Sequence, residues 1–413
     1  MTQPYLDTME TGATKASTAP TADTPFVLVG SCDHRIWGRR VDDTLAKQLE
    51  KSGLANQVNI NTEASGSAAP NEEDRLAAHD EVVLARADTY LDRCAISLLR
   101  SVCPSVFLAQ NAIGQSRALA VYCKGKDAKQ WRAQLDRDGF DNQKLLAGTH
   151  VIAAESPPLV YDYELRKQSL PLIRSVTPDV CLEIERTTFG LAYKGVTDIV
   201  TKYVYPWPAF HATRLAANLG LTPNSITFVS VVLVFVVMAL FAQGQFAAGV
   251  AVGFLMSFLD TLDGKLARVT QQTSKFGKHF DHITDLVHPP FWWLAYWWGA
   301  GGAQPPAYWN EAAIVTALGY VAIRVQEWRF KRRLGVRIHV WQPFDSQFRL
   351  ITTRRNTNLL LLAGAVGVGE PTAGLFAVAA WTVASLAIHG VRWAQAEVEL
   401  RRIGKLTSWL ERL

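Results

Sequence analysis

The sequence contains few cysteines, and their arrangement matches neither a metal site nor a disulfide framework. Five cysteines occur in 413 residues, an odd number without the paired spacing of a zinc motif. All lie in the first half of the chain: Cys32, Cys94, Cys103, Cys123 and Cys181. We therefore expect reduced thiols in the cytosol rather than a secreted, disulfide-linked fold.

The beginning of the chain lacks the apolar stretch that a secretory signal peptide requires. Residues 1–24 are instead rich in Thr, Ala and Ser. Because such a composition buries little apolar surface, we predict a flexible tail there.

Long apolar runs are missing from the first half and abundant in the second. Residues 1–215 are polar and mixed in charge, whereas apolar stretches alternate with short basic loops after Thr222. The overall 49% of hydrophobic residues is therefore an average over two environments. This contrast predicts a cytosolic domain followed by a domain inside a membrane.

Residues 25–170 show the pattern of an α/β domain. Short apolar runs are separated by helical stretches such as 42–51 and 91–100, which predicts a mostly parallel sheet with helices on its faces. The runs expected to form strands are 26–29, 82–85, 118–122 and 150–154.

Residues 171–220 are predicted to form a helical linker that carries both charge signs. It ends in an amphipathic stretch, 210–219, with Arg214 on the polar side. A helix of this kind lies on a membrane surface.

Residues 221–400 are predicted to form a membrane bundle of six helices, followed by a cytosolic tail, 401–413. Thr222 is a plausible N-cap and Pro223 a first helical residue for the first span. The fourth and fifth spans are short for a hydrocarbon core of roughly 30 Å. The expected spans are 226–243, 246–268, 279–298, 312–325, 359–368 and 375–391.

The loops between these spans predict the orientation. The connection from the second to the third span, counted with the last turn of the second, carries four basic residues, Lys265, Arg268, Lys275 and Lys278. Nine lie from Arg324 to Arg355, whereas the loops 299–310 and 369–374 contain no Lys or Arg. Basic loops stay in the cytosol. We therefore expect an integral membrane protein, of the inner membrane in a bacterium, with both termini in the cytoplasm.

Four aspartates lie where the second and third spans meet the cytoplasmic loop. Asp260 and Asp263 are three residues apart, and Asp281 and Asp285 are four apart, so each pair shares one helix face. Antiparallel helices can bring the two pairs together into one carboxylate pocket. Because such acids repel one another, we expect them to bind a hard divalent cation, Mg²⁺ or Mn²⁺.

Small residues follow the first acid pair. Gly264 and Ala267 leave a strip of helix backbone uncovered, against which a flat ligand can lie. Arg268 adds a fixed positive charge that suits a phosphate.

This pattern resembles the signature of the CDP-alcohol phosphotransferase family, D-x-x-D-G-x-x-A-R, eight residues, then G-x-x-x-D-x-x-x-D. All eight positions of the signature are filled: Asp260, Asp263, Gly264, Ala267, Arg268, Gly277, Asp281 and Asp285.

The resemblance implies a six-helix membrane enzyme that is commonly a homodimer. It implies that the metal ligands are Asp260, Asp263 and Asp281, and that Asp285 is the general base. It further implies a CDP-binding set comprising Gly264, Ala267, Arg268 and Gly277.

The function expected on these grounds is transfer of a phosphoalcohol from a CDP-alcohol donor to an acceptor hydroxyl, with release of CMP. The expected partners are donor, acceptor and membrane lipid, without nucleic acid. An ion-coupled transporter also places acids between helices. However, it does not explain the spacing of Gly264, Ala267 and Arg268. The alcohol on CDP and the acceptor stay open.

The linker from Tyr193 to Phe210 resembles the one in proteins that fuse a nucleotidyltransferase to such a membrane domain. A cytidylyltransferase needs a glycine-rich loop after its first strand, but residues 30–40 contain only Gly30 and Gly38. Asp88 stands where a metal-binding acid would lie, although a lone Asp after a strand usually serves a turn. We favour a degenerate domain, with a bifunctional enzyme as the alternative.

A basic run follows the fourth span. Topology and attraction to anionic lipid account for it, while the functional interpretation is a site for an acceptor phosphate. The run comprises Arg324, Arg329, Lys331, Arg332, Arg333 and Arg337.

Overall fold

The computed structural model describes most of the chain, which forms two compact units. The described residues are 24–56, 72–110, 114–137, 139–140, 145–162, 165–272, 275–302 and 305–412, without the side chains of 56, 72–74, 275–283 and 285. The predicted tail therefore lies outside the described residues up to position 23. The five cysteines all lie in the described part of the chain, and none of them forms a disulfide bond.

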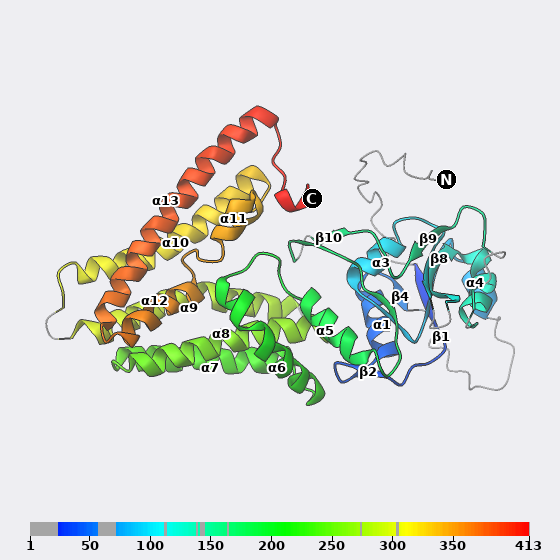
Figure 1. Cartoon of the computed structure of the whole chain (residues 1–413), viewed down its shortest axis with the longest axis horizontal. Coiled ribbons are helices and arrows are strands. Elements are labelled where there is room, and N and C mark those ends of the chain that lie inside the picture. Colours follow the sequence, from blue (N-terminus) through cyan, green and yellow to red (C-terminus); the bar gives the residue numbers. More distant parts are fainter. Residues whose placement is uncertain are drawn as a thin grey trace. The chain divides into compact units, whose positions relative to one another are not determined.

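The first unit comprises residues 1–34, 40–158 and 170–178 and is built around a six-stranded sheet (Figure 1). In spatial order the strands are β4 (Ala55–Asn56), β1 (Pro25–Val29), β5 (Glu81–Arg86), β8 (Ser116–Lys124), β7 (Ser105–Gln110) and β9 (His150–Ala153). Only β8, among these strands, runs antiparallel to its neighbours. The mostly parallel sheet predicted from the apolar runs is therefore present.

Helices cover this sheet, and both of its faces are buried. The central strand β5 is fully buried from Val82 to Ala85, which explains why its sequence is continuously apolar rather than alternating. Asp92 caps the helix α3 (Arg93–Leu99) by accepting a hydrogen bond from the Ala95 N–H at 2.7 Å. The helices of this unit are α1 (Val41–Lys51), α2 (Glu72–Ala77), α3 (Arg93–Leu99), α4 (Ala128–Leu135) and the short η1 (Gly125–Asp127).

Short strand pairs complete both units. Strand β6 (Thr89–Leu91) pairs with β12 (Ile173–Ser175), and β10 (Val160–Asp162) pairs with β11 (Lys167–Ser169). The remaining pair is β2 (Arg35–Ile36) with β3 (Arg39–Arg40).

The second unit comprises residues 35–39, 159–169 and 179–413 and is helical. Thr222 caps α7 by accepting a hydrogen bond from the Ser225 N–H, and Pro223 is its first residue, as predicted. The longer helices are α5 (Cys181–Leu191), α6 (Pro206–Asn218), α7 (Pro223–Ala242), α8 (Phe246–Val269), α9 (Lys275–Gly301), α10 (Trp309–Leu334), α12 (Arg355–Gly367) and α13 (Pro371–Ile403). Shorter elements are η3 (Val200–Val204), η4 (Ile338–Val340), α11 (Pro343–Phe348) and η5 (Trp409–Glu411).

Each of the six predicted spans lies within one of these helices or extends one residue beyond its end. Among the described residues, three helices are long and apolar enough to cross a membrane, namely α7, α8 and α13. Helix α12 has 13 residues and thus a length of about 20 Å, short of a core of roughly 30 Å. Large apolar side chains such as Phe228 and Phe235 on α7 are exposed, which fits contact with lipid. The protein is therefore a membrane protein, but a count of six crossings is not confirmed.

Small residues let α7, α8 and α9 pack closely. A Cβ at Gly299 on α9 would lie 1.9 Å from the Phe241 carbonyl oxygen, and one at Gly249 on α8 would lie 2.5 Å from the Phe241 ring. A larger residue at either position would push its helix away from α7. This close packing fixes α7 beside both α8 and α9.

Trp37 belongs to the helical unit and holds α5 against α6. Its side chain is buried, and it packs against the rings of Phe189 and Phe210. Its backbone N–H and indole N–H donate hydrogen bonds to Glu185 and Thr188, each at 2.9 Å. Glu185 also pairs with Arg214 at 2.8 Å, so the polar side predicted for Arg214 faces a partner on α5.

Candidate active site

Two of the predicted acids lie one turn apart at the end of α8. Asp263 is buried, with 4% of its surface exposed, and accepts a hydrogen bond from the Thr227 hydroxyl at 2.5 Å. Thr227 lies on α7, and its hydroxyl oxygen is also 3.1 Å from the Pro223 carbonyl oxygen, an alternative acceptor for the same hydrogen. A carboxylate buried at this depth needs a cation or strong donors nearby to remain ionised.

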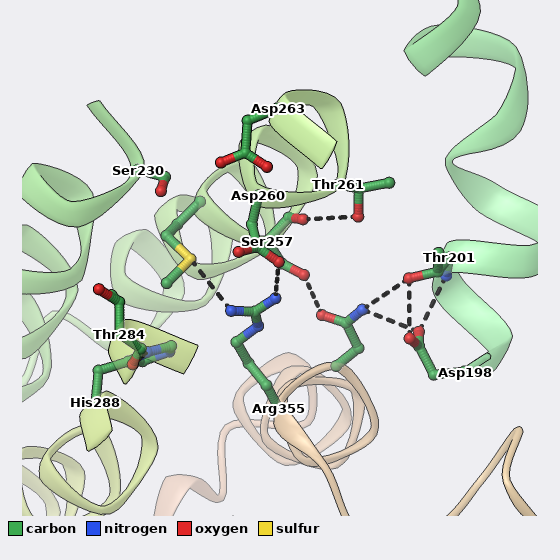
Figure 2. A network of polar contacts seen from close by, with 12 residues as sticks. Asp198, Thr201, Ser230, Ser257, Asp260, Thr261, Asp263, Thr284, His288 and Arg355 are labelled. Carbon is green, nitrogen blue, oxygen red and sulfur yellow. Dashed lines mark hydrogen bonds and ion pairs between the residues drawn. The ribbon is translucent and has the colours of Figure 1, made fainter. Parts of the chain in front are cut away.

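Asp260 has a cationic partner from another helix (Figure 2). The Arg355 guanidinium, at the start of α12, lies 2.6 Å from the Asp260 carboxylate, and about a sixth of each side chain is exposed. Arg355 also contacts the Met256 sulfur at 3.8 Å. The pocket therefore already compensates one acid with a fixed positive charge.

A buried polar network positions the start of α12. Asn356 forms a hydrogen bond with Ser257 of α8 and donates to Asp198 at 2.9 Å (Figure 2). Asp198 also accepts from the backbone N–H and the hydroxyl of Thr201, at 3.0 and 2.9 Å. Burial alone would raise the pKa of Asp198, but the charge of Arg349 and these donors hold it below the usual value. The network ties residues 198–201, α8 and α12 together next to Asp260.

The predicted CDP-binding residues of α8 form one face with Asp260. A Cβ at Gly264 would lie 3.3 Å from the Arg268 guanidinium, so that side chain lies over the glycine. The Arg268 Nε–H donates to the Ala192 carbonyl oxygen at 3.0 Å. Gly264 and Ala267 are both half-buried, which leaves part of the backbone strip accessible.

The other predicted site residues fall on α9, where Gly277, Asp281 and Asp285 belong to the side chains outside the described residues. Their convergence with Asp260 and Asp263 therefore stays a prediction. Among the side chains that are described, no group of three or more His, Cys, Asp or Glu could hold a metal ion.

A second charged cluster surrounds Glu327 of α10. Its carboxylate lies 2.7 Å from Arg354, 3.1 Å from Arg324 and 2.9 Å from His339. Burial and the neighbouring charge of Arg354 push the pKa of Arg349 below its usual value. The cluster therefore holds more guanidinium groups than carboxylates.

The structure divides the basic run that follows the fourth predicted span. Arg324 joins the cluster around Glu327, whereas Arg329, Lys331, Arg332 and Arg333 are exposed. Sequence reasoning counted Arg349 and Arg354 only as cytoplasmic charges, and it missed Thr227, Asp198 and Asn356. None of these five belongs to a motif, and no signal in the sequence distinguishes them from surface residues.

In the α/β unit, Asp88 is enclosed by two arginines. Both of its oxygens contact Arg86, at 3.0 and 3.2 Å, and one of them also contacts Arg117 at 3.0 Å. These side chains lie at the ends of β5 and β8. Asp88 stands where a nucleotidyltransferase would carry a metal-binding acid, and its negative charge is already compensated by the two arginines.

The comparisons with known proteins agree with the signature. Residues 220–388 match the family model described as CDP-alcohol phosphatidyltransferase. This part of the chain, which contains α7 to α12 and much of α13, is a CDP-alcohol phosphatidyltransferase domain.

One relative is the archaetidylinositol phosphate synthase of Pyrococcus horikoshii, 42% identical over 77 residues. The match covers 18% of this chain and spans 39% of that relative's length. Two structures of Mycobacterium tuberculosis phosphatidylinositol phosphate synthase, one with CDP-DAG and one with manganese and citrate, are each 18% identical with a TM-score of 0.37. Each match covers 45% of this chain, and the two cover 92% and 88% of the solved chains, respectively.

Proposed function

We propose that this protein is a membrane enzyme that transfers a phosphoalcohol from a CDP-alcohol to an acceptor hydroxyl and releases CMP. The observation that carries the proposal is the complete eight-residue signature inside the matched residues 220–388. The acid pair on α8, with Asp263 buried and Asp260 paired with Arg355, supports it.

The donor set fits a divalent cation. Asp260 and Asp263 offer carboxylate oxygens on one helix face, and Asp281 is the third proposed ligand. Oxygen ligands of this kind suit Mg²⁺ or Mn²⁺, and a bound cation would neutralise charge on the diphosphate of the donor.

The remaining roles belong to the chain's own residues. Gly264 and Ala267 leave room for the nucleotide, with Gly277 close by on α9, and Arg268 binds a phosphate through its guanidinium. Asp285 takes the proton from the acceptor hydroxyl as that hydroxyl attacks the phosphorus attached to the alcohol. The bond between this phosphorus and the leaving CMP then breaks.

The acceptor that fits best carries a phosphate of its own. The cluster formed by Arg324, Arg349, Arg354 and Glu327 has excess positive charge, and it belongs to the same helical unit as Asp260. Guanidinium groups bind phosphate through paired hydrogen bonds. The name of the Pyrococcus horikoshii relative, an inositol phosphate-linked synthase, fits a polyol phosphate as acceptor.

This acceptor class predicts a selective defect in Arg354→Met. Losing a charged hydrogen bond costs about 1.5–3 kcal/mol, so the KM for a polyol phosphate should rise roughly 10- to 100-fold. The KM for the CDP-alcohol should stay near the wild-type value. The control is Arg332→Met, which removes the same group from an exposed position. Equal use of an acceptor without phosphate by the wild-type enzyme would contradict this acceptor class.

The proposed reaction is tested by measuring CMP. Purified full-length protein, mixed with CDP-diacylglycerol, Mg²⁺ and a panel of polyols and polyol phosphates, should release CMP only when an acceptor is present. A lipid product should form in equal amount. Transport of ions across vesicles without any release of CMP would instead favour the transporter interpretation.

We further propose six crossings, cytoplasmic termini and active site, and a homodimer. Loop charge supports this topology.

The α/β unit is proposed to be a degenerate nucleotidyltransferase-like domain, because Asp88 is held by Arg86 and Arg117. Incubation of the full chain with labelled CTP and alcohol phosphates should yield no CDP-alcohol. Formation of CDP-alcohol would make the protein bifunctional.

A further inference from the structure

A segment outside the matched residues 220–388 lies against the signature on α8. After α5 ends at Leu191, Ala192 accepts a hydrogen bond from Arg268 at 3.0 Å. The Lys265 ammonium then lies over the Tyr193 ring, 2.6 Å from its centroid, and 5.5 Å from the centroid of the Phe189 ring. Residues 189–193 therefore border the strip proposed to bind the nucleotide.

Lys265 is a buried basic side chain on α8. Its exposed fraction is 2%, and within the described part of the chain it contacts aromatic faces but forms no ion pair with a carboxylate. Burying a charge is costly unless an opposite charge accompanies it, and the aromatic rings supply only part of that compensation.

Tyr193 has a buried polar group without a partner. Its hydroxyl forms no hydrogen bond with any residue that the structure describes, although the atom is shielded from solvent. Leaving such a group unpaired is unfavourable. An ammonium without an anion and a hydroxyl without a partner thus belong to two side chains in contact with one another.

We propose that Lys265 and Tyr193 recognise the nucleotide of the donor, an inference that rests on the proposed function. Lys265 pairs with a phosphate of the CDP group, and the Tyr193 hydroxyl forms a hydrogen bond with its nucleoside. Lys265 fills a position that the family signature leaves open, and Tyr193 lies before the matched domain. The Trp37 ring packs against Phe189 and so helps to hold α5, which leads into Tyr193, in place.

The test measures the Kd of CDP for the full-length protein in detergent with Mg²⁺. Lys265→Met keeps a side chain of similar length and removes a buried charge, so folding should be preserved. It should weaken CDP binding roughly 10- to 100-fold, as expected for a charged hydrogen bond. Tyr193→Phe keeps the ring and should weaken binding about 3- to 10-fold, as expected for a neutral one.

The chain offers a matched pair of controls. Lys202 lies 5.2 Å from the centroid of the Tyr203 ring, in the same kind of contact, but Tyr203 is 64% exposed. Lys202→Met and Tyr203→Phe should leave the Kd of CDP unchanged. In kinetic assays the two test variants should raise the KM of the donor and leave the KM of the acceptor alone, a split that a general structural defect would not produce.

The outcomes separate this inference from the proposed function. If wild-type protein binds CDP and Lys265→Met binds it equally well, the recognition role is wrong while the enzyme assignment stands. Equal losses for donor and acceptor would also overturn it. If the wild-type protein neither binds CDP nor releases CMP, the proposed function fails, and this inference fails with it.

Discussion

Removing divalent metal should abolish turnover, and Mg²⁺ or Mn²⁺ should restore it. The proposed ligands Asp260, Asp263 and Asp281 are expected to converge, so without a cation they would repel one another, and the charge of the donor's diphosphate would lack compensation. The measurement is CMP release in EDTA, followed by titration with each metal. Full activity in chelator would show that the chemistry does not need a metal.

The same expectation applies to a single ligand. Asp263→Ala should lower activity to background at ordinary Mg²⁺ concentrations, because it removes one carboxylate from the set. The Thr227 hydroxyl now donates a hydrogen bond to Asp263. In the variant it would lose this partner, but it could donate to the Pro223 carbonyl oxygen instead. The fold should therefore survive, which a thermal melt can check. Asp43→Ala removes an exposed acid from the α/β unit and serves as the control.

The fold followed from the sequence wherever one periodic pattern determined the environment. The apolar run Val82–Ala85 is buried on both faces of the sheet, and a continuous run of this kind has no other stable place in an α/β domain. Thr222 and Pro223 begin α7 because their side chains suit those two positions and few others. Such signals are local, so a single sequence is enough to interpret them.

The surroundings of the site did not follow, because they depend on contacts between distant segments. Asp198 and Asn356 are 158 residues apart, and neither differs in sequence context from an ordinary surface residue. Residues 35–39 lie in the stretch where a nucleotidyltransferase would carry its phosphate-binding loop. In this protein Trp37 instead packs with α5 and α6. The spacing of Asp260 and Asp263 predicted a shared helix face, but it could not predict which helix supplies Arg355.

The length of the helix at the fourth predicted span also could not be predicted from the apolar pattern. The fourth predicted span lies in α10, which has 26 residues and continues as a polar helix to Leu334. An apolar pattern ends where the helix surface becomes polar, whereas backbone hydrogen bonding continues along the helix. The polar extension carries Glu327, and with it the cationic cluster proposed to bind the acceptor.

Asp285→Asn should lower turnover by roughly 10²- to 10⁴-fold, the usual contribution of a general base. The substitution keeps the shape of the side chain but removes its ability to accept a proton. Asp285 lies one turn beyond Asp281 on α9, and we propose that it faces the acceptor rather than the diphosphate. Binding of metal and CDP-alcohol should therefore survive, and calorimetric titration with the CDP-alcohol measures this directly.

The dependence on Mg²⁺ distinguishes this base from the ligands. Asp281→Asn weakens a metal ligand, so raising Mg²⁺ should recover part of its activity, because mass action compensates for lower affinity. No concentration of Mg²⁺ should recover Asp285→Asn, since its lost step is proton removal. Activity is measured against Mg²⁺ for both variants, with Asp43→Asn as the control. Recovery of Asp285→Asn at high Mg²⁺ would make Asp285 a ligand, and the base would then have to be another group near the acceptor.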